Sequence, residues 1–210
     1  MKFELPTFTQ AKINRANVRS EKHGPDELVP AVDLSITIEQ PNSVLSEFDG
    51  FLLSALYFKS EAASDDEQGQ PDGVEPITDL PNLRFTHLAY PIKWDQEGTG
   101  YTCTIDHGLG GKSNLTLTGC KVNSFALTPK EGGTVEVKFR VQCGEGLDEK
   151  TLGKIAMLVQ HSVPVKLVAP DAEGWQQAEQ ELGIGDDEDD EGDELTPETA
   201  LAGAVAGDEQ

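Results

Sequence analysis

Cysteine is scarce in this sequence, and the few cysteines present exclude several classes of protein. Cys103, Cys120 and Cys143 include no Cys-x-x-Cys pair, and their number is odd, so the spacing does not describe a disulfide framework. Each lies in a stretch that reads as a strand, where a buried free thiol packs as a small apolar side chain. We therefore expect three unpaired thiols and a reducing cytoplasm.

Long apolar runs are also missing. The N-terminal segment MKFELPTFTQAKINR contains no apolar run of signal-peptide length. No other stretch approaches the roughly 20 apolar residues that a membrane-spanning helix needs. These two absences predict a cytoplasmic protein without a membrane segment.

Basic residues are absent from the last fifth of the chain. All 16 Lys and Arg lie in residues 1–170, together with 23 Asp and Glu, whereas residues 171–210 carry 15 acids and no base. A run of like charges repels itself and buries too little apolar surface to fold alone. The sequence therefore predicts a globular domain over 1–170 and a disordered acidic tail over 171–210. This balance disfavours a protein that coats duplex DNA or an anionic membrane, and it favours a basic partner.

Alternation of apolar and polar residues dominates the first 170 residues and predicts strands. The clearest case is 134–143, where five alternate residues from Val135 to Cys143 are apolar. A turn-forming cluster at 129–133 precedes it, so 121–128 and 134–143 read as a hairpin. The alternation slips near Gly119, which indicates a bulge or a strand break. Further strands are expected at 32–38, 101–105, 115–118 and 163–167, the last at a sheet edge because Pro164 cannot donate a backbone hydrogen bond.

Two segments have helical spacing, 43–57 and 149–160, with Asn42 or Ser43 and then Asp148 as their N-caps. The acidic stretch 60–80 reads as a mobile surface loop. Together these patterns predict a β-rich α+β domain. Its antiparallel sheet would form a sandwich or a small barrel, with one or two packed helices and the disordered acidic tail.

The most conspicuous short motif runs from Gly108 to Ser113 (GLGGKS) and contains the end of a phosphate-binding P-loop. The full motif needs Gly where this chain has Asp106, and it must lead into a helix. Here an alternating strand-like run follows. We interpret the segment as a glycine-rich connection between two strands.

No catalytic or metal-binding pattern is present. The four histidines are dispersed, the acidic residues do not match a calcium loop, and no nucleophile elbow occurs. The group formed by Cys103, Asp106 and His107 reads as structural. We therefore expect a protein that is not an enzyme and that uses no cofactor or metal.

One segment is free of acids and rich in aromatic and basic residues, residues 84–94 (RFTHLAYPIKW). Rings that stack on bases, beside cations that meet phosphates, are what single-stranded nucleic acid requires. A strand face carrying Lys121, Lys138 and Arg140 would extend the groove. The alternative is that many of these rings belong to the core. The candidate nucleic-acid-binding residues are Arg84, Tyr90, Lys93, Trp94, Tyr101, Lys112, Lys138 and Arg140. The candidate partner-binding residues of the tail are Asp186, Asp187, Glu188, Asp189, Asp190 and Glu191.

Three stretches carry a resemblance: 23–38, 90–111 and 120–143. They resemble a group of uncharacterised tailed-phage proteins over about a third of the chain. The resemblance implies a phage accessory protein from a replication or recombination region, in the cytoplasm of a bacterial host, and it supplies no catalytic residues.

Two functions follow as hypotheses. The first is an accessory protein of DNA metabolism that binds single-stranded DNA or a basic DNA-processing partner, with an autoinhibitory or recruiting acidic tail. The tail ends in AGDEQ, without the apolar tip of bacterial single-strand-binding proteins. The second is an acidic interaction protein, either a DNA mimic that blocks a host nucleic-acid-binding protein or a virion component.

Overall fold

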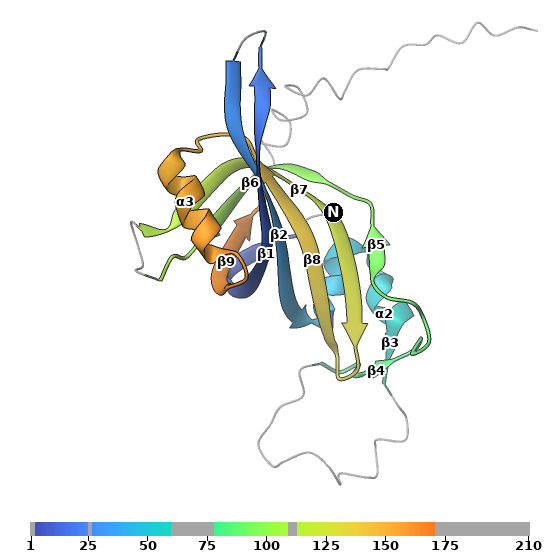
Figure 1. The fold of residues 1–210 in the computed structure, drawn as a ribbon. Helices are drawn as coiled ribbons and strands as arrows, with labels where there is room; N and C mark the ends of the chain where they lie inside the picture. The colour runs from blue at the N-terminus through green and yellow to red at the C-terminus, as the bar shows by residue number, and fades with distance from the viewer. Residues whose placement is uncertain (1–2, 25–26, 60–77, 109–112, 171–210) are drawn as a thin grey trace, which may run out of the picture.

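The computed structural model describes residues 3–24, 27–59, 78–108 and 113–170, and its central feature is a closed antiparallel barrel of six strands (Figure 1). Around the barrel the strands follow the order β1, β2, β8, β7, β6, β9 and return to β1. The predicted fold class, with a barrel as one of its two forms, is confirmed. The strands are β1 (Leu5–His23), β2 (Glu27–Pro41), β6 (Gly98–Ile105), β7 (Leu115–Lys130), β8 (Thr134–Cys143) and β9 (Ser162–Val168).

Two features extend beyond the closed barrel. The β1–β2 hairpin continues past it as an arm, at the top of Figure 1, because β8 pairs with β2 only between Val32 and Pro41. The short strand β5 (Ile92–Trp94) pairs with the far end of β7, beyond the part of β7 that pairs with β6. A separate two-stranded sheet joins β3 (Tyr57–Phe58) to β4 (Asn82–Leu83).

The predicted hairpin is confirmed. Strand β8 covers 134–143, and β7 merges the predicted strands 115–118 and 121–128. The slip near Gly119 is a bulge within one continuous strand: Gly119 has φ of +63°, and the β6–β7 register shifts between Tyr101 and Cys103. The glycine-rich segment around Gly108 connects β6 to β7, as expected, although 109–112 lie outside the described residues.

The longest strand, β1, was not expected from the sequence, and the edge position expected for 163–167 is wrong. Strand β9 pairs with β1 on one side and with β6 on the other. Pro164 is tolerated because β6 ends at Ile105. Beyond the end of β6, the Pro164 carbonyl accepts a hydrogen bond from Asp106 N at 2.9 Å. No residue of β6 needs a backbone N–H from Pro164 as its hydrogen-bond donor.

The predicted helix over 43–57 is broken into three short pieces, η1 (Asn42–Val44), α1 (Leu45–Phe48) and α2 (Leu52–Leu56). The break falls at Asp49, whose backbone is extended and whose carboxylate accepts from Phe51 N at 2.8 Å, so a new turn starts there. The expected capping role of Asn42 is wrong, because its amide is buried and donates to Leu80 O at 2.8 Å.

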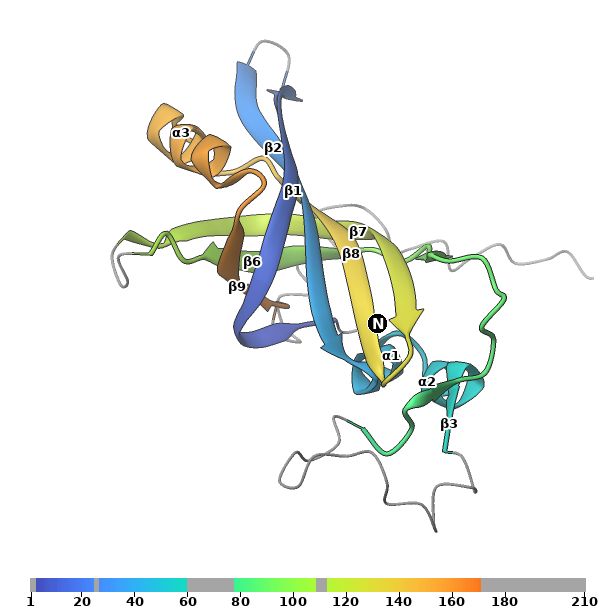
Figure 2. The ribbon, with the colours of Figure 1, turned by 60° about the horizontal axis from the view of Figure 1, so that its bottom comes forward.

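The second predicted helix is confirmed as α3 (Glu149–Leu158). Asp148 caps it by accepting from Thr151 N at 2.7 Å, and a hydrogen bond with the Thr151 side chain, together with this backbone bond, lowers the pKa of Asp148. Helix α3 and the α1–α2 pair lie at opposite ends of the barrel (Figures 1 and 2). Of the predicted loop 60–80, residues 60–77 lie outside the described residues, and so does the whole predicted tail.

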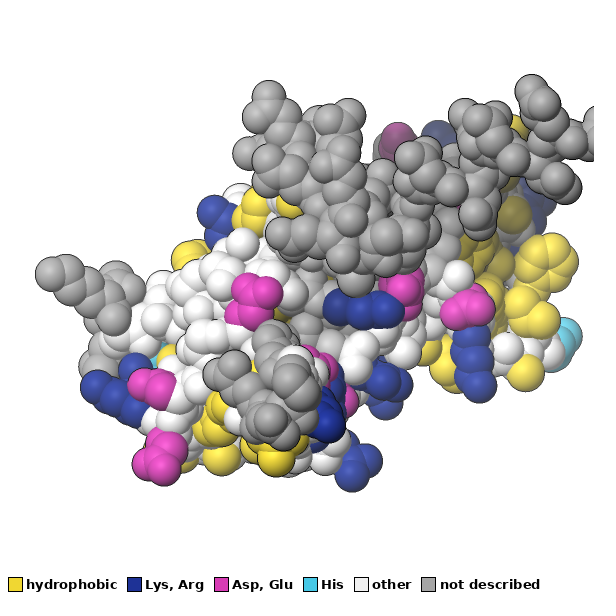
Figure 3. Space-filling model, turned by 90° about the horizontal axis from the view of Figure 1, so that it is seen from above, with side chains coloured by type: hydrophobic (Ala, Val, Ile, Leu, Met, Phe, Trp, Pro, Cys, Tyr) yellow, Lys and Arg dark blue, Asp and Glu magenta, His cyan; other side chains and the backbone are white. Residues whose placement is uncertain are grey.

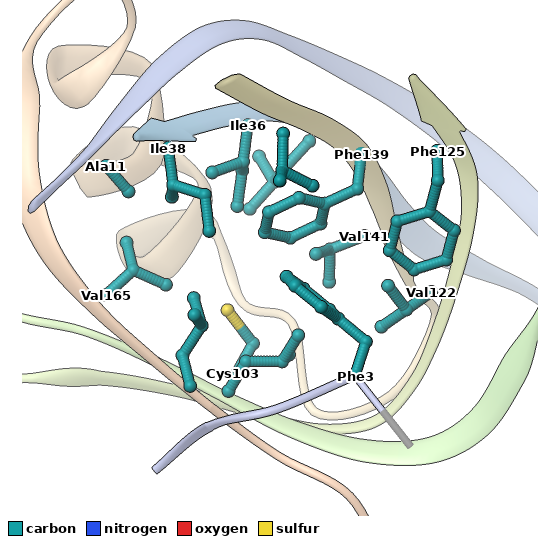
Figure 4. Packing of buried hydrophobic residues seen from close by; sticks show 14 of the residues in the cluster. Phe3, Ala11, Ile36, Ile38, Cys103, Val122, Phe125, Phe139, Val141 and Val165 are labelled. Carbon is teal, nitrogen blue, oxygen red and sulfur yellow. The ribbon is translucent and has the colours of Figure 1, made fainter. Parts of the chain in front are cut away.

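The barrel interior is filled by the inward residues of all six strands and by a phenylalanine from before β1 (Figure 4). The Phe3 ring lies 5.3 Å from both the Phe125 and the Phe139 rings, in edge-to-face contacts that aromatic pairs prefer. All three cysteines are buried free thiols, as predicted. Among the described residues, no helix is long and apolar enough to cross a membrane.

Candidate anion-binding face

A row of lysines crosses the outside of the barrel. Strand pairing places Lys93 (β5) opposite Ala126 (β7), Ala126 opposite Lys138 (β8), Lys138 opposite Thr37 (β2) and Thr37 opposite Lys12 (β1). Directly opposite residues share one face of a sheet. Since neighbouring strands are about 4.8 Å apart, successive lysines of the row are about 10 Å apart.

A second row of cations runs beside the first. Arg140 on β8 lies opposite Asn123 on β7 and opposite Ser35 on β2, and Ser35 lies opposite Arg15 on β1. We call the outward side chains Lys12, Arg15, Lys93, Lys138 and Arg140 the cationic face. All five side chains are exposed.

The cationic face is hollowed at its centre. A groove of about 470 Å³ lies over β1, β2, β7 and β8. Its lining residues are Asn14, Arg15, Asn17, Asp33, Ser35, Ser124, Lys138, Phe139 and Arg140. Small and amide side chains on the groove floor add hydrogen-bond donors to the cations around it.

Two irregularities of the strands border this groove. The β1–β2 register shifts between Ile13 and Arg15, leaving Asn14 as the extra residue, and Asn14 donates to Thr37 Oγ1 at 2.7 Å. The β7–β8 register shifts between Asn123 and Ala126, around Ser124, whose φ is +56°. Bulges bend and twist a strand locally, and they are over-represented next to functional sites.

The charges of the cationic face are not compensated by neighbouring acids. Among the described residues, none of its five cations has an ion-pair partner, whereas nearby basic residues do. Lys121 pairs with Glu97 at 2.7 Å, and Lys130 pairs with Glu39 at 2.6 Å. This second pairing raises the pKa of Lys130.

The one acid that lines the groove is neutralised by its neighbours. Asp33 accepts from Arg19 Nε at 2.9 Å and from Gln142 Nε2 at 3.2 Å. The hydrogen bond to Asp33 is the main cause that raises the pKa of Arg19. The groove therefore presents a net positive surface to solvent.

The three aromatic candidates differ in how deeply their side chains are buried. The prediction that Tyr101 contacts nucleic acid is wrong: its side chain is 1% exposed and faces the core, and burial raises its pKa to about 12. Trp94 is half-buried, with its ring 6.2 Å from Phe48 and its Nε1 donating to Gln96 at 3.0 Å. Tyr90 is also half-buried and donates to Phe85 O at 3.0 Å.

The most exposed apolar side chains of this region belong to other residues. Phe85 is 51% exposed and Leu88 is 47% exposed, in the segment that leads into β5. Arg84 holds this segment against α2, since its Nε donates to Ser54 O at 3.1 Å and its guanidinium lies 5.3 Å from the Phe58 ring centre. Figure 3 shows hydrophobic side chains gathered at this end of the molecule, next to Lys and Arg.

The structure therefore brings together only part of the predicted set. Lys93, Lys138 and Arg140 share the cationic face, and Arg84, Tyr90 and Trp94 lie at the neighbouring end, around β5. Lys112 and the tail residues 186–191 lie outside the described residues. Sequence reasoning missed Lys12 and Arg15, because β1 has little apolar alternation that would have identified it as a strand.

Within the described residues, no group of three or more His, Cys, Asp or Glu side chains is arranged to hold a metal ion. Comparisons with protein-family models, with curated proteins and with solved structures find no match to this chain.

Proposed function

We propose that this chain is a non-enzymatic phage accessory protein of DNA replication or recombination that binds single-stranded nucleic acid on the cationic face. The supporting observation is the register of five exposed cations that have no acidic partner among the described residues, whereas the nearby Lys121 and Lys130 are paired with acids. Phosphate binding depends on such uncompensated Lys and Arg.

The shape of the face suits a polymer better than a small anion. The lysine row spans four inter-strand spacings, about 19 Å, and the groove beside it is shallow and open. A single strand can bend over a curved barrel and turn its bases toward exposed rings such as Phe85. The outer face of a small barrel serves oligonucleotide binding in other folds, which is an analogy only.

The acidic tail completes the proposal as an intramolecular competitor. The described chain ends at Pro170, and the run 186–191 follows 16 residues later. An extended segment of that length can span about 50 Å, compared with about 33 Å for the ten residues of β8. The run can therefore reach the cationic face, where its carboxylates would occupy phosphate positions.

Fluorescence anisotropy with a labelled single-stranded oligonucleotide tests this function. The variant replaces Asp by Asn and Glu by Gln at positions 186–191 of the full chain. The matched control removes the same number of acids from another segment, at Glu61, Asp65, Asp66, Glu67, Asp72 and Glu75.

We expect the tail variant to bind more tightly than the wild type, and the control to change much less. An equal gain in both variants would show a net-charge effect instead of competition by the tail. If neither the wild type nor the tail variant binds the oligonucleotide at low salt, the nucleic-acid proposal is refuted. The second hypothesis, an acidic interaction protein, would then remain.

A further inference from the structure

Two of the three buried thiols face each other across the β7–β8 ladder. Strand pairing places Lys121 opposite Gln142, and continuing this register by one residue brings Cys120 of β7 opposite Cys143 of β8. Both side chains point into the core, with exposed fractions of 0% and 1%. Both thiols donate to the same backbone oxygen, Thr118 O, at 3.8 Å from the Cys120 sulfur and 3.4 Å from the Cys143 sulfur, so the two sulfurs lie close together.

Cross-strand cysteines in this arrangement meet the main geometric demand of a disulfide. Directly opposite residues of an antiparallel pair have Cα atoms about 4.5–5.5 Å apart, within the range that disulfides span. Cys103 does not share this relation, because it lies opposite Leu117 on β7 and opposite Leu167 on β9.

We propose that Cys120 and Cys143 are a redox modification site, at which a small neutral peroxide converts the two thiols into a reversible cross-strand disulfide. This inference does not depend on the proposed function. Closing the bond would fasten β7 to β8 at the end of the β8 strand.

The electrostatics of the pair distinguish its two members. The hydrogen bond with Cys120 is the largest cause acting on Cys143, and it lowers the pKa of that thiol, whereas burial raises it. The same thiol–thiol bond, together with burial, raises the pKa of Cys120. In the proposed order, Cys143 supplies the thiolate that attacks the oxidant, and Cys120 resolves the intermediate.

The reaction balances with hydrogen peroxide as the oxidant. The Cys143 thiolate attacks one peroxide oxygen, the O–O bond breaks, and hydroxide leaves and takes up the proton that Cys143 released. The Cys120 thiol then attacks the Cys143 sulfenic sulfur, and water leaves as the S–S bond forms. Two thiols are oxidised and one peroxide is reduced to two waters.

The surface outside the pair is hollowed. A hollow of about 190 Å³ is lined by the residues on either side of both cysteines and by two residues of β1. The lining residues are Gly119 and Lys121 of β7, Gln142 of β8, Gly144 after β8, and Arg19 and Glu21 of β1. Neither glycine covers the backbone with a side chain. The carboxylates of Glu145 and Glu21 lie directly against these glycines, and the two cations of the hollow, Arg19 and Lys121, are paired with Glu21 and Glu97. Among the described residues, the hollow therefore holds no unpaired cation that would attract an anionic oxidant.

Peptide mapping of the full chain tests the site without any mutation. Trypsin cuts at Lys and Arg, so Cys103, Cys120 and Cys143 fall in three different peptides: 94–112, 113–121 and 141–150. After hydrogen peroxide treatment of the folded protein and alkylation of free thiols, we expect a 113–121/141–150 cross-link that disappears on reduction.

Two variants complete the test. Cys103→Ala should still form the cross-link, whereas Cys143→Ala should form none, and circular dichroism establishes that both are folded. The proposal is overturned if all three thiols of the folded wild type stay open to alkylation after oxidation. A cross-link that forms only in urea, or one that uses Cys103, overturns it equally.

Discussion

Removing two charges from the centre of the cationic face gives the sharpest test of its role. Lys138→Gln with Arg140→Gln takes away two exposed side chains that make no ion pair or hydrogen bond within the described residues. The stability of the barrel should therefore change by no more than about 0.5 kcal/mol. A loss of oligonucleotide binding by this variant would then come from the two missing charges and not from unfolding.

The magnitude follows from counting phosphate contacts. For single strands the logarithm of the binding constant falls with the logarithm of salt concentration by about 0.7 per neutralised phosphate. Five contacts on the cationic face give a slope of about −3.5, and three give about −2.1. Between 50 mM and 200 mM salt, binding should weaken about 130-fold for the intact face and about 20-fold for the double variant.

The assay is a salt series of anisotropy titrations, with both proteins in the background where the acids at 186–191 are neutralised. The matched control is Lys150→Gln with Lys154→Gln on α3, which makes the same charge change outside the cationic face. We expect the control to keep the full slope. The reasoning fails if the α3 control lowers the slope as much as the face variant does.

Two predictions concern stability. Phe139→Ala should lower the free energy of unfolding in urea by about 3–5 kcal/mol, because this ring fills the barrel against Phe3. Phe85 is 51% exposed, so Phe85→Ala should lower it by well under 1 kcal/mol. Equal losses in the two variants would contradict the assigned core. Partial burial raises the pKa of the Glu47 carboxyl above its ordinary value of 4.5. The ionised carboxylate therefore destabilises the folded state when the pH lies above the folded-state pKa. This destabilisation is lost as the pH falls through the folded-state pKa and the carboxylate takes up a proton. Glu47→Gln should therefore raise the melting temperature at pH 7 and give no gain below about pH 4, and a gain that is independent of pH would refute the assignment.

The reliability of the strand predictions depended on how regularly the apolar residues alternate. The run from Val135 to Cys143 buries every second residue, and its predicted bounds match β8. Strand β1 was missed, because most of its 19 residues are polar and only Leu5, Ala11 and Ile13 are buried. It is held in the barrel by ladders to β2 and β9, which local sequence does not reveal.

Strand alternation also decided which candidate site residues could be placed correctly from the sequence. Lys138 and Arg140 alternate with buried residues of β8, so their outward direction followed from the sequence. Tyr101 alternates in the same way within β6, but an aromatic residue can serve the core or a binding surface, and its inward direction was decided by the barrel.

By itself, the sequence determined the charge division of this chain, the period-two strands and the capped helix α3, since each depends on residues close together along the chain. Tertiary structure alone decided that the sheet closes, that Lys12 and Lys93 join one row with Lys138, and that Cys120 meets Cys143. These relations depend on register between distant strands. Register is set by which faces the closed barrel must bury together.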